Sequence, residues 1–207
     1  LNWSVQAHYF KNKKKLVNLK KKNKHLKIIK LNFSDYNKKN FENKLKNKFN
    51  SNFDSFINLI GYTDGKSYDS TKLKDITKVL TINTFIPIIV QKILLKKMIK
   101  NKWGRILNCS GIGVKFGGGK YNYNYSLSQH CREFIPSTFK DLAKNNILIN
   151  NIRIGVTDTK IHKKIKKNIK NRIKLIPINR MATTKEMASY ITNLSSESNS
   201  YMTGQTI

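Results

Sequence analysis

The sequence is short of acidic residues, cysteine, proline and uninterrupted apolar runs, and each shortage excludes a class of protein. Two cysteines, Cys109 and Cys131, give neither a disulfide framework nor the paired spacing of a metal site. We expect both to be structural, in a reduced, cytoplasmic setting. The most apolar stretch, 79–95, contains Thr81, Asn83, Gln91 and Lys92, and these interruptions favour a buried helix over a membrane span. No secretory signal is recognisable in the sequence.

Acidic residues number only 11 against 41 lysines and arginines, which gives a formal net charge of +30. Such a charge attracts polyanions, and nucleic acids are the first class to consider. The lysines, however, are scattered in runs such as 13–15, 20–22 and 163–170, and little arginine is available for bidentate contacts with phosphate or guanine. We therefore expect solvated basic faces and only nonspecific, salt-sensitive nucleic-acid binding, and keep a basic nucleic-acid-binding protein as a third alternative.

The pattern of apolar runs predicts an α/β protein, with a single domain over residues 1–207. Short apolar runs that are typical of buried strands alternate with longer helical patterns, of which 70–100 carries Pro87 as an expected kink. A doubly wound parallel sheet follows, with any ligand at the carboxyl ends of its strands. The strands are expected at 4–10, 26–33, 55–61, 104–110, 147–155 and from 204, and the helices at 36–52, 70–100, 123–144, 158–171 and 184–195.

Several motifs occur in an order that resembles the short-chain dehydrogenase/reductase family, and they cover nearly the whole chain. They include "LNFSD" (31–35), "NLIG" (58–61), "LTIN" (80–83), "GRILNCSG" (104–111), "YNYSLSQH" (123–130) and "ILINNIRIGVTDT" (147–159). The set is most similar to single-domain members such as 3-oxoacyl-carrier-protein reductases. The resemblance implies a Rossmann-like doubly wound parallel sheet that is truncated at the first strand, because that strand and its glycine-rich turn precede Leu1 in the family. We expect both ends to be cut and the sheet to have a gap.

The resemblance also implies a reaction, the NAD(P)-dependent interconversion of a carbonyl and an alcohol by hydride transfer. In the family a tyrosine hydroxyl is the general acid or base, and Tyr125 fits this position. Tyr121 and Tyr123 compete with it, but neither has a lysine four residues later. Free tyrosine has a pKa of about 10 and needs assistance at neutral pH.

Two positions that assist the tyrosine in the family differ in this chain. The lysine four residues later, whose charge favours tyrosinate and which binds the nicotinamide ribose, is Gln129 here, and the serine that holds the substrate oxygen is Gly111. Ser110 can replace that serine only through a local bulge, because a one-residue slip reverses the side-chain direction. His130 cannot replace the lysine, because one further residue turns it about 100° around the helix. Asn83 matches the family's helix-kinking, water-holding asparagine.

The cofactor is expected to be NADP or NAD. Lys11 and Lys13 follow the strand at 4–10 where an acid would bind the adenosine ribose, and this slightly favours NADP. By the same resemblance the cofactor-binding residues are Asp35, Asn58, Gly61, Gln129, Gly155, Thr157 and Thr159.

Two functions stay open from the sequence. The first is an active oxidoreductase that acts on a small-molecule carbonyl or alcohol substrate. The second is a catalytically impaired or dead family member that serves as a binding or assembly subunit. In either case the resemblance implies a homo-oligomer that pairs through the helices at 70–100 and 123–144, with no membrane partner.

Overall fold

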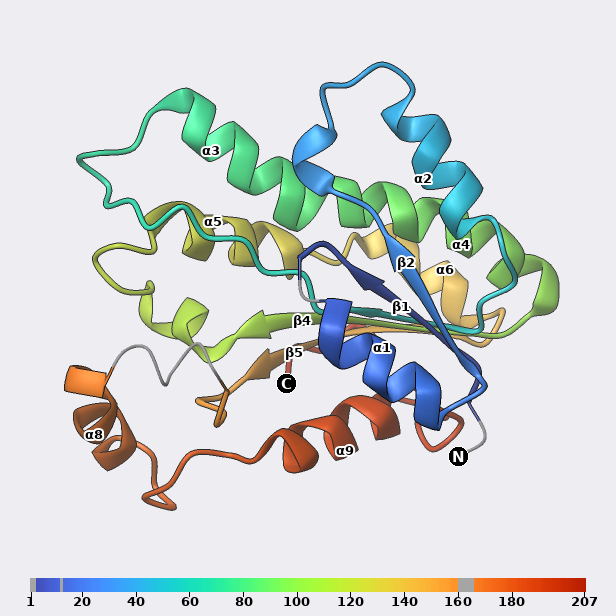
Figure 1. Cartoon of the computed structure of the whole chain (residues 1–207). Coiled ribbons are helices and arrows are strands. Elements are labelled where there is room, and N and C mark those ends of the chain that lie inside the picture. Colours follow the sequence, from blue (N-terminus) through green and yellow to red (C-terminus); the bar gives the residue numbers. More distant parts are fainter. Residues whose placement is uncertain (1–2, 12, 160–165) are drawn as a thin grey trace. The chain divides into compact units, whose positions relative to one another are not determined.

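The structure, a computed structural model, describes residues 3–11, 13–159 and 166–207. The chain divides into two compact units, Leu1–Asn50 and Ser51–Ile207, which are described separately. Each unit contains its own parallel sheet, β1-β2 in the first and β3-β4-β5 in the second (Figure 1). The predicted α/β class with parallel strands is therefore confirmed, and the strands fall into two sheets.

The first unit is built around two parallel strands and a small aromatic core. Val5 pairs with Leu26, and Phe33 stacks on His8 with 4.6 Å between ring centroids. The strand expected at 26–33 is shorter, because the Asn32 side chain accepts a hydrogen bond from the Ser34 N–H (3.0 Å) and starts a helical turn. The elements are β1 (Val5–Tyr9), α1 (Lys13–Lys22), β2 (Leu26–Lys30), η1 (Phe33–Asp35) and α2 (Phe41–Phe49).

The second unit carries the strands that position the candidate site. Its sheet has the order β3 (Ser55–Asn58), β4 (Gly104–Gly111), β5 (Ile147–Ile154), all parallel. The register places three asparagines, Asn58, Asn108 and Asn151, side by side across the strands. Thr206 forms a parallel bridge to Asn151, where the sequence predicted a further strand.

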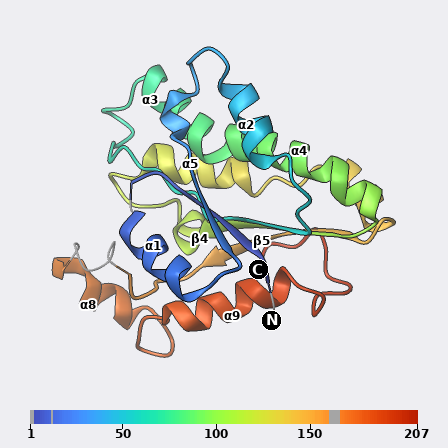
Figure 2. The ribbon, with the colours of Figure 1, turned by 45° about the vertical axis from the view of Figure 1, so that its right-hand side comes forward.

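Helices cover both faces of this sheet. The α4 and α5 helices lie on one face and α9 on the other (Figures 1 and 2). Leu107, Cys109 and Ile152 from the strands pack with Ile191 from α9 in a buried apolar cluster. The elements of this unit outside the sheet are α3 (Leu73–Leu80), the π-helical segment η2 (Thr81–Phe85), α4 (Ile86–Asn101), η3 (Ile112–Phe116), α5 (Tyr123–Arg132), η4 (Ser137–Phe139), α6 (Lys140–Ala143), α8 (Lys166–Lys174) and α9 (Thr184–Leu194).

The long helix predicted over 70–100 is present, and its irregularity lies just before Pro87. The helical run Leu73–Asn101 is long and apolar enough to cross a membrane by length and composition alone, with a mean hydropathy of 1.5. Half of that apolar window is buried inside the protein, and Val79, Val90 and Leu94 are among its most buried side chains. A core helix of a folded domain passes the same test, so this finding is weak support for a membrane span.

The helix predicted over 123–144 is wrong in its second half. The α5 helix ends at Arg132, and only the short η4 and α6 turns follow before β5. Pro136 explains the interruption, because proline lacks an N–H donor and disfavours a helical conformation in the residue before it. The helix predicted at 158–171 begins on residues 160–165, which lie outside the described residues; the described helix α8 begins at Lys166.

Candidate active site

Tyr125 lies at the carboxyl ends of β3 and β4, where a parallel sheet binds its ligands. Its hydroxyl is 3.7 Å from the position that a Cβ would occupy on Gly111, and 3.9 Å from the corresponding position on Gly61. The half-buried phenol is therefore bordered by two glycines, one at the end of β4 and one just beyond β3. This is the placement that the sequence predicted for a tyrosine acting on a substrate.

The two competing tyrosines are located elsewhere. The Tyr123 ring packs edge-on against Tyr68, with 5.1 Å between ring centroids. Tyr121 is exposed and stands beside Lys120, whose ammonium is 5.7 Å from the ring centroid. No contact between either ring and Gly111 is seen in the described part of the chain. Tyr125 is thus the tyrosine that the fold directs toward the end of β4.

Ser110 makes a different contact from the one that a substitute catalytic serine requires. Its hydroxyl donates a hydrogen bond to Oε1 of Glu133, the residue after α5. Glu133 also binds Arg153 through a charge-assisted pair (2.6 Å). Residues 104–111 of β4 pair continuously with β5, and no bulge redirects Ser110 toward Tyr125.

Asn83 is fully buried in the π-helical segment, and its side chain is fully engaged. Its amide accepts from the Tyr62 N–H (2.8 Å) and donates to the Tyr62 carbonyl (2.8 Å) and to the Ser128 hydroxyl (2.9 Å). Ser128 in turn donates to the Tyr125 carbonyl (2.7 Å). Asn83 therefore ties the loop after β3 to the helix that carries Tyr125, and π-helical turns of this kind are frequent at functional sites.

The carbonyl of Asn83 has a separate role, because Pro87 stands four residues later. Proline has no N–H, so this carbonyl lacks its usual helical donor. Arg132 replaces that donor, with Nη2 at 2.7 Å and Nε at 3.0 Å from the Asn83 oxygen. The third contact of the guanidinium is a 2.7 Å hydrogen bond from Nη1 to the carbonyl of Cys109 on β4.

Gln129 stands one helical turn after Tyr125 and is completely buried. Both polar atoms of its amide, Oε1 and Nε2, lack a hydrogen-bond partner within the described residues. An unpartnered buried amide costs about 1–3 kcal/mol. This unused donor and acceptor occupy the position where the family resemblance expects contact with a ribose, so the residue fits a nicotinamide cofactor in hydrogen-bonding capacity and lacks the charge.

The protonation states of the site follow from burial and from Arg132. Burial raises the pKa of the Tyr125 phenol, and the nearby Arg132 guanidinium acts in the opposite direction. Burial lowers the pKa of the Arg132 guanidinium from its very high ordinary value, and because arginine keeps its proton in proteins, the side chain stays charged. Burial also raises the pKa of the Cys109 thiol to about 12, so this cysteine is neutral and unreactive. At neutral pH Tyr125 is therefore a phenol that can donate a proton.

The remaining expected cofactor residues are not all brought to this position. The Asn58 amide is used within the sheet, where it donates to Asn108 (3.2 Å). Thr157 is buried and donates to the Gly155 carbonyl (2.9 Å), whereas no contact of the Thr159 side chain is seen in the described structure. Asp35 belongs to the first unit, where it pairs with Lys38 (3.0 Å).

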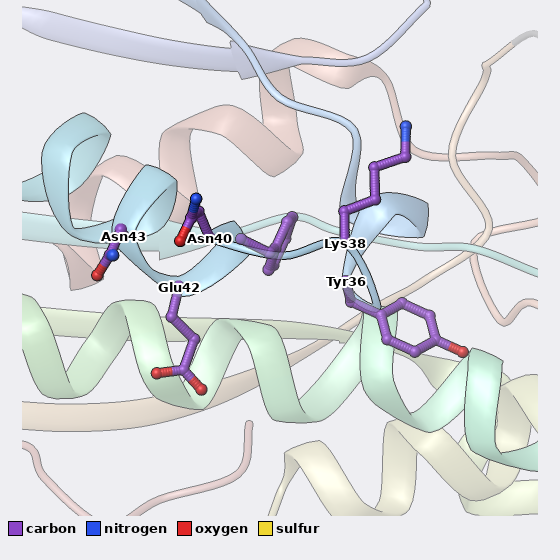
Figure 3. A pocket seen from close by; sticks show the side chains of 6 residues that line it. Tyr36, Lys38, Asn40, Glu42 and Asn43 are labelled. Atoms are coloured by element: carbon purple, nitrogen blue, oxygen red, sulfur yellow. The ribbon is translucent and has the colours of Figure 1, made fainter.

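A pocket in the first unit does not contain any of these residues. It has a volume of about 380 Å³ and is lined by Tyr36, Lys38, Asn40, Phe41, Glu42 and Asn43 (Figure 3). The labelled side chains point in different directions and do not converge on one point. The chemistry of the site therefore has to be found at the strand ends of the second unit.

Comparison with known proteins agrees with this geometry. The family model described as "Enoyl-(Acyl carrier protein) reductase" matches residues 2–207. The chain belongs to the short-chain dehydrogenase/reductase family. It is an oxidoreductase-family protein that resembles 3-oxoacyl-[acyl-carrier-protein] reductases.

Curated relatives in the family carry several names. A 3-oxoacyl-[acyl-carrier-protein] reductase of Aquifex aeolicus is 35% identical over 156 residues, which is 74% of this chain and 62% of that protein. An acetoacetyl-CoA reductase of Acinetobacter is 28% identical over the same shares, 74% and 62%. The aligned part of this chain thus spans less than two thirds of these relatives.

Solved structures extend the likeness in fold to nearly the whole chain. The NADPH-dependent reductase YwfH, involved in bacilysin biosynthesis, superposes with a TM-score of 0.84 at 23% identity, over 99% of this chain and 86% of that one. A 3-oxoacyl (acyl-carrier-protein) reductase from Agrobacterium tumefaciens with NADP bound gives 0.83 at 19% identity, over 98% and 81%. The Rossmann-like fold predicted from the sequence is confirmed.

Two residues of the site in this family member were missed by sequence reasoning, Ser128 and Arg132. Both have a signal in the sequence. Ser128 directly precedes the glutamine that replaces the lysine, and Arg132 stands seven residues after Tyr125, close to two helical turns and therefore on the same face. The position of Pro87 four residues after Asn83 further indicates a carbonyl that needs a donor.

Proposed function

We propose that the protein is an NAD(P)-dependent reductase of small carbonyl compounds, related in substrate class to 3-oxoacyl reductases. The observation that supports this most directly is the Tyr125 hydroxyl, which faces Gly111 and Gly61 at the carboxyl ends of β3 and β4. A phenol protonated at neutral pH, in a half-buried position, is suited to donate a proton to a carbonyl oxygen. The bound nicotinamide would supply the hydride that makes the reaction a reduction.

The residues of the candidate site have separate roles in this proposal. Tyr125 gives its proton to the substrate oxygen, and the amide of Gln129 binds the cofactor ribose through its unpartnered atoms. Gly155 and Thr157, beyond the end of β5, border the nicotinamide, as the family resemblance implies. Gly111 leaves space beside the substrate oxygen and offers no hydroxyl to hold it. We therefore expect slower turnover than in a family member that carries the serine.

The choice of cofactor is proposed to be NADP over NAD. Phe10 and Lys11 follow the end of β1, and Lys13 begins α1, so the chain after this strand is basic. Lysines favour a 2′-phosphate, whereas an acidic residue favours a free ribose hydroxyl. The NADP bound to the Agrobacterium reductase is in keeping with this preference.

The test is direct on the full-length protein. NADPH and NADH are titrated while nicotinamide fluorescence is followed, and reduction of an acetoacetyl substrate is then assayed. We expect binding of NADPH, slow turnover, and a loss of about 100-fold or more in Tyr125→Phe, the usual scale for a general acid. Tyr123→Phe is the matched control and should keep its activity, because that ring packs on Tyr68.

A gain-of-function variant makes the test sharper. In Gly111→Ser the new Cβ would lie 3.7 Å from the Tyr125 hydroxyl, an ordinary van der Waals distance, so the serine fits without a clash. Its hydroxyl can then reach the oxygen that Tyr125 protonates. We expect turnover to rise by about tenfold, the equivalent of roughly 1.4 kcal/mol in the transition state. A folded protein that binds neither dinucleotide would sink the reductase proposal.

The second proposal is a catalytically impaired subunit that is retained for assembly, in the cytoplasm and as a homo-oligomer. The observation that favours it is the apolar surface of α4 and the π segment, where Phe85 and Ile88 are half exposed and Ile89 and Ile99 are also exposed. Such a surface is typical of protein contacts. Sedimentation of the protein distinguishes an oligomer from a monomer, and the turnover assay above decides whether chemistry accompanies assembly.

A further inference from the structure

Arg132 is a buried cation that pairs with no carboxylate in the part of the chain that the structure describes. Its side chain is 5% exposed, and it makes three hydrogen bonds, all to backbone carbonyl oxygens. Within the described residues no carboxylate forms an ion pair with it. Burying an unpaired charge is expensive, so a fold that retains one usually uses it.

Among the ionisable groups near Arg132, Tyr125 is the one in the candidate site whose ionisation the positive charge favours. Glu133, the nearest acid along the chain, is engaged by Arg153 and Ser110. On α3, which packs against α5, Asp75 is held by Lys66 at 2.6 Å. The Lys115 side chain on η3 is exposed, and Cys109 on β4 is neutral. The electrostatic partners of Arg132 are Tyr125 and the Cys109 thiol.

The Arg132 guanidinium and the Tyr125 hydroxyl both lie against the carboxyl end of β4. Arg132 bonds the carbonyl of Cys109, and the Tyr125 hydroxyl faces Gly111, two residues further along the same strand. Two residues of a strand span about 7 Å. Because the two groups contact neighbouring points of one strand, the guanidinium lies within electrostatic range of the phenol, and the interaction between them favours tyrosinate.

We propose that Arg132 is a positioning residue that supplies, three residues further along α5, the positive charge that the family carries where this chain has Gln129. It acts on Tyr125 through space, and it fixes the π-helical segment through the Asn83 carbonyl. The assignment rests on the proposed role of Tyr125 as the proton donor. The arginine thus replaces the charge of the family's lysine from the same face of α5. Pro87 has no N–H to donate to the Asn83 carbonyl, and this carbonyl therefore accepts the hydrogen bonds that hold Arg132.

The charge and the hydrogen bonds of Arg132 can be separated by two variants. Arg132→Gln keeps a donor for the carbonyl oxygens and removes the charge, whereas Arg132→Lys keeps the charge and makes fewer hydrogen bonds. Carbon-13 tyrosine NMR follows the ionisation of Tyr125, and its signal is assigned with Tyr125→Phe. This readout requires neither cofactor nor substrate.

We expect Arg132→Gln to move the titration of Tyr125 upward by about one pH unit and to lower kcat about tenfold, while Arg132→Lys changes both much less. Adding Gln129→Lys to Arg132→Gln should return the titration toward the wild-type position, because the charge is restored one turn from the phenol. Arg105→Gln is the matched control, the same substitution of a buried arginine at the opposite end of β4, and the folded variant should leave the titration unchanged.

Opposite results overturn the assignment. If folded Arg132→Gln titrates like wild type, or if the glutamine and lysine variants behave alike, Arg132 only braces carbonyl groups. If Gln129→Lys, added to Arg132→Gln, fails to restore the titration of Tyr125, then Arg132 does not substitute for a charge at position 129. Absence of turnover in the wild type, with these titrations as expected, would refute the reductase proposal and leave the electrostatic pairing of Arg132 with Tyr125 standing.

Discussion

Two buried arginines, Arg105 and Arg132, stand near opposite ends of β4 and are held in the same way. Arg105 donates to the carbonyls of Asn199 (2.8 Å), Gly104 (2.9 Å) and Asn146 (2.7 Å), and Arg132 donates to the carbonyls of Asn83 and Cys109. Both are buried, and burial lowers the pKa of each guanidinium. By contacts alone, the two would be assigned the same structural task.

The surroundings of the two guanidinium groups differ. Arg105 stacks on the Trp103 ring at 4.4 Å and has the charge of Glu197 in its vicinity, so its positive charge is compensated at the amino end of the strand. Arg132 has the phenol of Tyr125 and a neutral thiol instead. In parallel sheets ligands bind at the carboxyl ends of the strands, which is where the uncompensated cation stands. On the proposal that Arg132 acts on Tyr125, the absence of a carboxylate partner among the described residues is what separates this arginine from Arg105, whose role is structural.

Removal of Arg105 gives the largest expected effect and tests the structural half of this comparison. Arg105→Met removes the guanidinium donor from the carbonyls of Gly104, Asn146 and Asn199 in a buried region, although the Asn146 carbonyl keeps the Gly104 N–H (3.2 Å). We expect a loss of about 3–5 kcal/mol in the free energy of unfolding, the usual cost of breaking a buried polar network. Urea denaturation measures it. A variant as stable as wild type would show that the amino end of β4 does not depend on this arginine.

Much of the fold around these arginines is predictable from the sequence. Apolar runs of four to eight residues alternating with helical patterns indicate parallel strands, and β4 and β5 occur within a residue of their expected limits. The end of α5 at Arg132 was not predicted, because the proline that interrupts the helix lies four residues further on. Nothing local in the sequence reveals that Glu133 turns away to bind Ser110 and Arg153.

The candidate site was predicted in part. Tyr125 and Gly111 were expected to lie close together, and the structure places them so. Their motifs are separate in the sequence, and the predicted fold class brings the helix that carries Tyr125 to the end of the strand that carries Gly111. The pairing of Asn58 with Asn108 and of Asn108 with Asn151 depends on strand register, which a single sequence does not specify. Arg132 was not predicted, because it lies three residues beyond the family's lysine position, although its spacing from Tyr125 and the location of Pro87 both indicate it.

The Gln129 amide in the site has no hydrogen-bond partner among the described residues, and its replacement gives the second largest expected change in stability. Gln129→Met exchanges an amide without partners for an apolar side chain of similar volume. We expect the free energy of unfolding to rise by about 1–2 kcal/mol, since the desolvation penalty of the amide disappears. Thermal denaturation of the protein without cofactor is the measurement.

Gln91→Met provides the control for this substitution. Gln91 is another buried glutamine, on α4, and its amide is not among the unpartnered groups of the described residues. We expect this variant to gain less stability than Gln129→Met, because the Gln91 amide is not among the fully buried, unpartnered groups, and equal behaviour of the two variants would contradict the interpretation of Gln129. If Gln129 binds a ribose, Gln129→Met should also weaken NADPH binding, so that stability and affinity change in opposite directions.

The smallest expected effect concerns the acid beside Arg132 and depends on pH. Burial tends to raise the pKa of Glu133, but hydrogen bonds from Arg153 and Ser110 outweigh it and leave the pKa lowered. Because the folded-state pKa lies below the unfolded value of about 4.3, the carboxylate stabilises the fold above that pH. This contribution is lost as the pH falls through the folded-state pKa.

Glu133→Gln should therefore be less stable than wild type at neutral pH, by about 1 kcal/mol or less after screening by solvent. The two stabilities should converge in acid, below the unfolded-state pKa, because there the wild-type carboxyl is protonated as well. Unfolding in urea at a series of pH values measures the difference. A difference that persists unchanged into acid would mean that Glu133 acts by packing alone. A change in the Tyr125 titration in this variant would mean that the Glu133 carboxylate does offset the charge of Arg132. Arg132 and Arg105 would then differ only in how much of their charge is compensated.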